Sequence, residues 1–242
     1  MTTLGVILAR AGSKGLPGKN TRLVASQPCV AWTLDHALAS ESLDEIIVSS
    51  DDADVLEIAR ERSVVTHARD PHLASDTATV DDAVRSAIND RNDADAIVIL
   101  YGNVPVRPPD LIDRAVSVLH KTRCDSVQSY CPVGKHHPWW MTTLGSDCEA
   151  VQPWQGDTLN HSVYRRQELP PAFIPDGGVL AVTREALFCE IPGVDPGPHA
   201  FLGRDRRGVK TREGEVIDID SEIDLLVADA ILTRATTTAR AA

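Results

Sequence analysis

The chain has 242 residues, of which 43% are hydrophobic and 24% charged, and its formal net charge is −11. This length suits one substantial core, so we predict a single domain over residues 1–236 and a frayed tail over 237–242. The acidic balance argues against nucleic-acid binding, which needs a basic face. The sequence contains neither a long apolar run nor a secretory leader, so we expect a cytoplasmic protein without membrane contact.

Five widely spaced cysteines form no C-x-x-C pair. This pattern favours reduced thiols over a disulfide framework or a zinc site. His136 and His137 have no acidic or cysteine partner at ligand spacing, so we do not interpret them as metal ligands.

Short β-rich apolar runs alternate with amphipathic stretches through the first half of the chain, as in βαβ units. Strands are expected at Leu4 to Ala9, Glu45 to Ser49, Val64 to Thr66, Ala96 to Leu100 and Ser126 to Tyr130. Helices are expected at Val30 to Ala39, Ala53 to Arg62, Val80 to Asn89 and Pro109 to His120. The predicted fold class is α/β, with a doubly wound, mostly parallel sheet.

The second half begins irregularly. Pro132 to Pro175 contains prolines, tryptophans and histidines without a clear period, which indicates long loops or an inserted arm. Strands are then expected at Gly178 to Val182 and Glu215 to Ile219, with a closing helix at Ile223 to Arg234.

A glycine-rich loop follows the first predicted strand. Residues 10–20, R-A-G-S-K-G-L-P-G-K-N, contain three glycines and three cations. Such a loop lets backbone amides approach an anion, and ligands of open α/β sheets bind at the carboxyl ends of strands. The loop matches neither the Walker A pattern nor G-x-G-x-x-G. It therefore predicts a triphosphate site, with a simple tight turn as the alternative.

Residues 6–20, V-I-L-A-R-A-G-S-K-G-L-P-G-K-N, resemble the opening signature of the CMP-sialic acid synthetases, or acylneuraminate cytidylyltransferases. Their relatives activate KDO and other nonulosonic acids. Further motifs at 46–51, 69–78, 136–138, 166–173 and 217–225 keep the resemblance in order, so it spans roughly residues 4–230. The resemblance implies a Rossmann-like nucleotidyltransferase fold and transfer of CMP from CTP to the anomeric hydroxyl of a 2-keto sugar acid, with release of pyrophosphate.

The resemblance also implies a nucleotide site. Asn20 and Arg69 match family positions near the nucleotide, and Ala78 matches the position that presents backbone to the base. For Arg69 a surface ion pair is the alternative. Val80 stands where relatives often have serine, which leaves bases other than cytosine open. The full predicted set comprises Ala9, Arg10, Gly12, Ser13, Lys19, Asn20, Arg69 and Ala78.

Asp218 and Asp220 end a predicted strand. Residues two apart on a strand point to the same side, so both carboxylates can hold a hard cation, Mg²⁺ or Mn²⁺. The equivalent pair holds the metal in the family. Alternatively, D-I-D-S-E is an acidic lead into a helix capped by Ser221. With Arg10 and Lys19, a metal would suffice for in-line transfer, so the predicted catalytic residues are Arg10, Lys19, Asp218 and Asp220.

The predicted sugar pocket departs from the sialic acid enzymes. Tyr101 replaces a sugar-binding glutamine, Trp140 replaces a lysine and Asp176 replaces an asparagine, whereas Arg166 is retained and suits a carboxylate. With Asn103, these residues form the predicted acceptor site. Trp139 and Trp140 could instead serve packing. The departures cast doubt on N-acetylneuraminate itself more than on the reaction class.

Two other functions stay open from the sequence. One is nucleotidyl transfer to a different sugar or alcohol, and the other is a catalytically idle nucleotide-sugar binding protein. Retention of the phosphate and metal residues argues against the idle protein. Family members are usually dimers whose inserted arm helps to build the sugar pocket, so the resemblance implies a homodimer, with CTP and a small acidic sugar as ligands.

Overall fold

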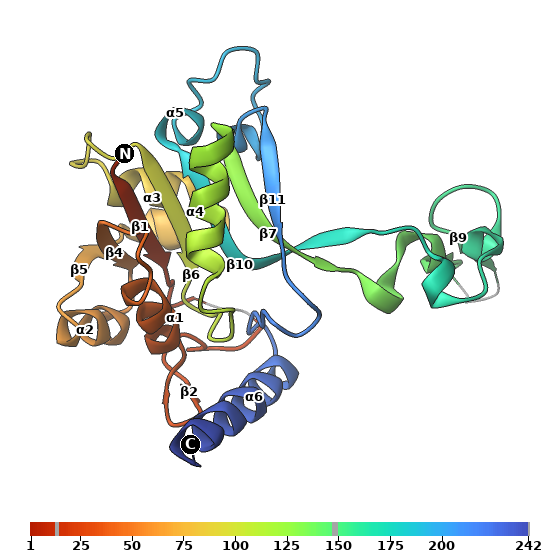
Figure 1. The fold of residues 1–242 in the computed structure, drawn as a ribbon, viewed down its shortest axis with the longest axis horizontal. Helices are drawn as coiled ribbons and strands as arrows, with labels where there is room; N and C mark the ends of the chain where they lie inside the picture. The colour runs from red at the N-terminus through yellow and green to blue at the C-terminus, as the bar shows by residue number, and fades with distance from the viewer. Residues whose placement is uncertain (13–14, 147–149, 242) are drawn as a thin grey trace.

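In the computed structural model, residues 1–12, 15–146 and 150–241 are described. Among these residues, seven strands form one sheet in the order β11-β7-β10-β6-β1-β4-β5, in which β10 runs antiparallel to β6 and β7 and the other pairs are parallel (Figure 1). The strands are β1 (Thr3–Leu8), β4 (Glu45–Ser50), β5 (Val65–Ala68), β6 (Ala96–Tyr101), β7 (Ser126–Pro132), β10 (Phe173–Thr183) and β11 (Arg206–Lys210). The predicted doubly wound, mostly parallel α/β sheet is confirmed.

Helices cover both faces of the sheet. One face carries α1 (Cys29–Leu38), α2 (Ala53–Glu61) and α4 (Leu111–Thr122), and the other carries α3 (Val80–Ala87) and α5 (Arg184–Leu187). All six residues of β1 are buried, as is usual for a parallel strand covered on both sides. The long closing helix α6 (Glu222–Ala241) packs beside the short hairpin of β2 (Leu23–Val24) and β3 (Gln27–Pro28).

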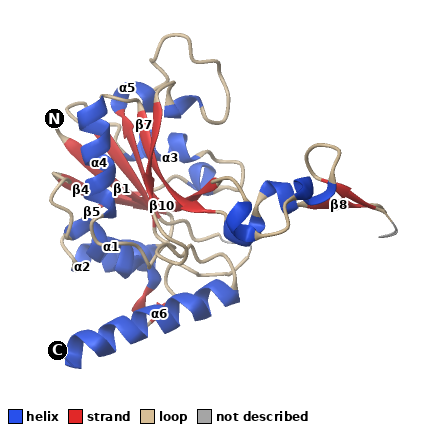
Figure 2. Ribbon diagram, turned by 45° about the vertical axis from the view of Figure 1, so that its right-hand side comes forward, coloured by secondary structure: helices blue, strands red, loops and turns tan. Residues whose placement is uncertain are grey.

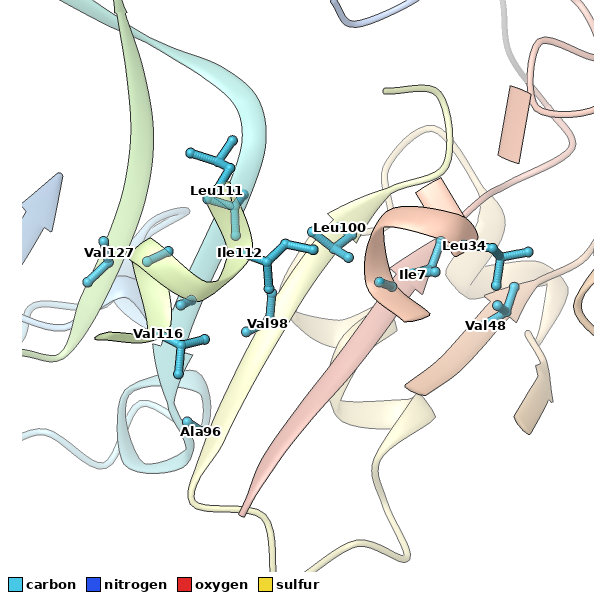
Figure 3. Close-up of a cluster of buried hydrophobic side chains, with 14 of the residues drawn as sticks. Ile7, Leu34, Val48, Ala96, Val98, Leu100, Leu111, Ile112, Val116 and Val127 are labelled. Atoms are coloured by element: carbon cyan, nitrogen blue, oxygen red, sulfur yellow. The ribbon is translucent and has the colours of Figure 1, made fainter. Parts of the chain in front are cut away.

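The core follows the two-residue alternation of the strands. On β6, Val98 and Leu100 pack with Leu34 of α1 and Ile112 of α4, as Figure 3 shows, whereas Ile99 points into the cluster on the opposite face. Side chains on both faces of β6 are therefore fully buried. Burial of this kind contributes about 1.5–3 kcal/mol for each large aliphatic side chain.

Four features differ from the sequence prediction. Residues 215–219 form no strand and make only an isolated bridge between Val106 and Ile217. Strand β11 was not predicted, because an edge strand with a single buried residue, Val209, shows no hydrophobic alternation. Strand β10 begins at Phe173, ahead of the predicted start, and helix α6 continues to Ala241 through most of the predicted frayed tail.

Residues 133–172, here called the projecting segment, leave the sheet between β7 and β10 and extend away from it in both views (Figures 1 and 2). They contain a hairpin of β8 (Thr142–Leu144) and β9 (Val151–Pro153), with 3-10 turns around it. In the described part of the chain, no helix combines the length and apolar character that crossing a membrane requires.

Candidate active site

A cleft of about 480 Å³ opens where the carboxyl ends of the central strands meet. Leu8 at the end of β1 and Tyr101 at the end of β6 both line it. This is the position at which open α/β sheets bind ligands. The cleft is lined by Leu8, Arg10, Gly15, Leu16, Lys19, Asn20, Arg69, Leu73, Ser75, Asp76, Ala78, Thr79, Val80, Ala83, Tyr101, Asn103, Asp218 and Asp220.

The glycine-rich loop closes one side of the cleft against the chain around Asp220. A Cβ atom on Gly15 would lie 2.5 Å from the backbone oxygen of Asp220, so glycine is needed for this approach. The Lys19 ammonium lies 2.5 Å from the Asp220 carboxylate. Asn20 is buried and donates from Nδ2 to the Arg10 carbonyl at 2.9 Å, which fixes the start of the loop.

Arg10 joins the loop to the opposite wall. Its guanidinium donates to Asp76 Oδ1 at 2.8 Å and to the Ala74 carbonyl at 3.4 Å. Ala74 ends η1 (Pro71–Ala74), and Asp76 lies between η1 and α3. The Arg10–Asp76 ion pair therefore spans the cleft, and both residues line it.

Arg69 is held more rigidly than Arg10. It is 7% exposed, and its guanidinium donates to the Ser49 hydroxyl at 3.1 Å and to the Ser49 carbonyl at 2.6 Å. Burial lowers the pKa of Arg69, and the nearby Arg10 acts in the same direction. The predicted alternative of a surface ion pair does not describe this buried arginine.

Asp218 and Asp220 lie in the cleft although their segment is not a strand. The chain is still extended there: Ile217 N bonds Val106 O at 3.2 Å and Ile219 N bonds Asn103 O at 2.9 Å. Ile219 is fully buried, so its two neighbours point the other way, toward the cleft. The Asn103 side chain donates to Asp218. Burial and the adjacent Asp220 carboxylate raise the pKa of Asp218 to about 6.

These two carboxylates fit a magnesium ion. They are oxygen donors at one edge of the cleft, and the raised pKa of Asp218 marks a place where added positive charge is stabilising. No group of three or more His, Cys, Asp or Glu that could hold a metal occurs among the described residues. Mg²⁺ commonly takes only one or two carboxylates and completes its shell with water and phosphate oxygens.

Ser221 also caps helix α6, as the alternative interpretation of this acidic segment proposed, because its Oγ accepts from the Asp224 N–H at 3.4 Å. Asp224 Oδ2 accepts from the backbone N–H of Ser221 at 2.8 Å and of Asp220 at 3.2 Å. The cap thus orients the backbone on which Asp220 stands. Capping and a metal-facing role involve different side chains and are compatible.

Most of the predicted nucleotide residues line the cleft: Arg10, Lys19, Asn20, Arg69 and Ala78. Ala9 is buried behind it and accepts a hydrogen bond from Ser50, and Gly12 lies on the exposed loop. Ser13 lies outside the described residues.

The predicted acceptor residues divide into two groups. Tyr101 and Asn103 line the cleft, whereas three others do not within this chain. Trp140 donates to the Val163 carbonyl at 3.1 Å in the projecting segment, and Arg166 pairs with Glu213 at 3.1 Å. Asp176 accepts from Ser129, Thr211 and the backbone of Gly178, which ties β10 to its neighbours.

Two residues were given no role from the sequence. Asp76 lies within the 69–78 motif that resembles the family. Its pairing with Arg10 of the glycine-rich loop appears only in the structure. Arg107 is 4% exposed, and none of its three guanidinium nitrogens has a hydrogen-bond partner among the described residues. Burial lowers the pKa of Arg107 to about 10. No sequence pattern signalled a buried arginine.

The fold and the cleft together define an α/β protein with a cationic glycine-rich loop facing two carboxylates at the strand ends. A profile described as cytidylyltransferase matches residues 4–146. The chain is 37% identical over 238 residues to CMP-N,N'-diacetyllegionaminic acid synthase of Legionella pneumophila, covering 96% of this chain and 97% of that protein. The chain belongs to the cytidylyltransferase family.

Other relatives are longer than this chain. It is 33% identical over 192 residues to the N-acylneuraminate cytidylyltransferase of Streptococcus agalactiae, covering 78% of this chain and 45% of that protein. The chain thus spans about half the length of several curated relatives. Among solved structures, CMP:2-keto-3-deoxy-manno-octonic acid synthetase complexed with CTP has the same fold, with a TM-score of 0.71 at 16% identity over 97% of this chain and 100% of that one.

Proposed function

We propose that this protein transfers CMP from CTP to the anomeric hydroxyl of a nonulosonic acid and releases pyrophosphate. The observation that carries the proposal is the convergence of Arg10 and Lys19 with Asp218 and Asp220 in one cleft at the strand ends. The names of the relatives, which include synthases of CMP-legionaminic acid and CMP-sialic acid, support the choice of reaction.

The cations and the carboxylates have different roles in this proposal. Arg10 and Lys19 bind the triphosphate and stabilise charge on the departing pyrophosphate. Asp218 and Asp220 would hold a magnesium ion, which would supply further charge neutralisation. Lys19 pairs with Asp220 and Arg10 pairs with Asp76 in the structure, and in this proposal bound nucleotide and metal would compete with these ion pairs.

Four apolar side chains, Leu8, Leu73, Val80 and Ala83, line the cleft and suit a planar base. The Ala78 N–H is already bonded to the Ser75 carbonyl at 3.3 Å. In this proposal the Ala78 carbonyl is therefore the backbone group that would accept from the exocyclic amine of cytosine. Uracil has no such donor at that position, so this contact would favour CTP.

We also propose that the protein is a cytoplasmic homodimer in which the projecting segment packs against a second copy. The segment exposes large apolar side chains, among them Trp154 at 66% and Tyr164 at 91%. Trp140 and Arg166 belong to the same segment and would reach an acceptor across the interface rather than within one chain. Light scattering of the wild type and of Trp154→Ser tests this: a dimer weakened by the substitution is expected, and a wild-type monomer would refute it.

The reaction is tested by pyrophosphate release with Mg²⁺, each common nucleoside triphosphate, and a panel of acceptors. The panel includes legionaminic acids, N-acetylneuraminate, KDO, and a neutral sugar. Release that requires CTP and one nonulosonic acid is the expected result. Release with another nucleotide or only with a neutral acceptor would refute the proposed substrate, and CTP binding without release for any acceptor would favour a binding protein.

A further inference from the structure

A hydrogen-bonded network connects Arg69 to strands β4 and β5 and to helix α3. Ser49 of β4 and His67 of β5 are direct partners in the parallel ladder, and Ser49 Oγ lies 3.0 Å from His67 Nδ1. The same Ser49 oxygen lies 3.1 Å from Arg69 Nε. On the far side of the imidazole, Nε2 lies 3.4 Å from Ser86 Oγ of α3.

The arginine fixes the direction of its own hydrogen bond in this network. A guanidinium can only donate, so Ser49 Oγ is the acceptor in its bond with Arg69. The single hydroxyl proton of Ser49 is then available to His67 Nδ1. In the arrangement inferred here Nδ1 accepts that proton, which makes His67 a neutral ring with its own proton on Nε2, facing Ser86. Burial lowers the pKa of His67, and the charge of Arg69 acts in the same direction, which agrees with a neutral ring.

Ser49 supplies the two guanidinium hydrogen bonds found for Arg69 among the described residues, one from its hydroxyl and one from its carbonyl. The carbonyl is fixed by the sheet, where it also accepts from Ala9 N at 3.2 Å. The hydroxyl is a free rotor unless something sets its direction. His67 is the group that sets it.

We propose that His67 is a positioning residue: by accepting the Ser49 hydroxyl at Nδ1, it holds the Arg69 guanidinium in the orientation that binds nucleotide in the cleft. This inference rests on the proposed function, because it takes the ligand beside Arg69 to be CTP. His67 touches no ligand itself, and its effect passes entirely through Ser49.

Three variants separate positioning from packing. His67→Leu removes the acceptor while keeping an apolar side chain of similar bulk. His67→Asn places an amide oxygen near the position of Nδ1 and should restore the bond. Ser49→Ala removes the hydroxyl that both partners share. His199→Leu, at an exposed histidine outside the cleft and the projecting segment, is the matched control.

We expect His67→Leu and Ser49→Ala each to weaken CTP binding and raise the KM for CTP about three- to tenfold, the value of one hydrogen bond, with kcat changed less than about twofold. His67→Asn should bind CTP nearly as the wild type does. The double variant His67→Leu/Ser49→Ala should bind CTP as tightly as Ser49→Ala alone, because both changes remove the same hydrogen-bonded link to Arg69. Thermal unfolding of each variant identifies any that fails to fold, and His67→Asn and Ser49→Ala then decide the question.

A spectroscopic measurement tests the network without CTP. In protein labelled with ¹⁵N at histidine, His67, identified by its loss from the His67→Asn spectrum, should show an unprotonated Nδ1 and a protonated Nε2. A proton on Nδ1, or wild-type CTP affinity in folded His67→Leu, would overturn the positioning role while leaving the proposed function intact. Absence of CTP binding by the wild type would refute the proposed function and the positioning role together.

Discussion

The Lys19 ammonium lies 2.5 Å from the Asp220 carboxylate, which joins two residues 201 positions apart in the sequence. The Lys19 side chain is 15% exposed and that of Asp220 is 73% exposed, so the lysine is the fixed partner and the aspartate the accessible one. The pair joins the glycine-rich loop to the segment that we propose to hold the metal.

Replacing Lys19 tests the loop directly. Lys19→Met should lower kcat/KM by at least about a hundredfold, because it removes a preorganised cation from the departing phosphates. The pyrophosphate assay measures the loss. Lys121→Met, at an exposed residue of α4, is the control and should leave turnover unchanged. Comparable turnover in the two variants would remove Lys19 from the mechanism.

Gly15 and Gly12 form a matched pair in the same loop. Gly15→Ala would bring a Cβ atom to 2.5 Å from the backbone oxygen of Asp220, whereas a Cβ on Gly12 meets nothing within 4 Å. Gly15→Ala should therefore displace the loop and weaken CTP binding by about tenfold or more, a loss of roughly 1.4 kcal/mol. Calorimetric titration with CTP measures both variants, and equal affinities would show that the close approach is unimportant for binding.

The ionised form of Asp218 should lower the free energy of unfolding of the metal-free protein. The pKa of Asp218 is about 6 in the folded protein against an ordinary value of 3.8. The protonated form, which is favoured in the folded protein, is therefore present at low pH and is lost as the pH rises through 6. At pH 7.5, Asp218→Asn should raise the free energy of unfolding by up to about 2–3 kcal/mol while abolishing activity.

Denaturant unfolding in the presence of a chelator measures this effect at pH 7.5 and pH 4. The gain should shrink at the lower pH, where Asp218 is protonated in the folded wild type. Asp220→Asn, at the more exposed carboxylate, is the control and should give a smaller gain. A destabilised Asp218→Asn protein at pH 7.5 would contradict the argument.

His36 should make the fold sensitive to acid. Burial and the nearby Arg107 lower its pKa to about 4 from an ordinary value of 6.5. The unfolded chain therefore binds a proton first, and stability is lost as the pH falls from 6.5 toward 4, by up to about 3 kcal/mol.

Substitution of His36 should reduce the stability that the protein loses as the pH falls. His36→Gln is expected to reduce the difference in unfolding free energy between pH 7 and pH 4.5, whereas His136→Gln, at an exposed histidine, should leave it as in the wild type. The same difference in unfolding free energy between pH 7 and pH 4.5 in both variants would show that other residues cause the acid sensitivity.

Local pattern predicted the elements that are buried and regular. The helix expected from Ala53 is α2, which begins at that residue, where the Asp52 side chain accepts from the Asp54 N–H at 3.0 Å. The strand expected from Ala96 is β6, whose side chains alternate between two cores. Strand β11 escaped prediction because its pairing with β7 depends on an edge position rather than on hydrophobic period.

The sequence alone determined the α/β class, the glycine-rich loop and the pair of carboxylates, because these depend on local periodicity, glycine geometry and residue chemistry. Only the tertiary structure decided that Lys19 meets Asp220, that Arg10 meets Asp76, and that Ser49 links His67 to Arg69. Such contacts join residues far apart in the chain and exist only after the strands have paired in register. The tertiary structure also decided that Trp140 and Arg166 do not line the cleft of their own chain, because both belong to the projecting segment, which extends away from the sheet (Figure 1).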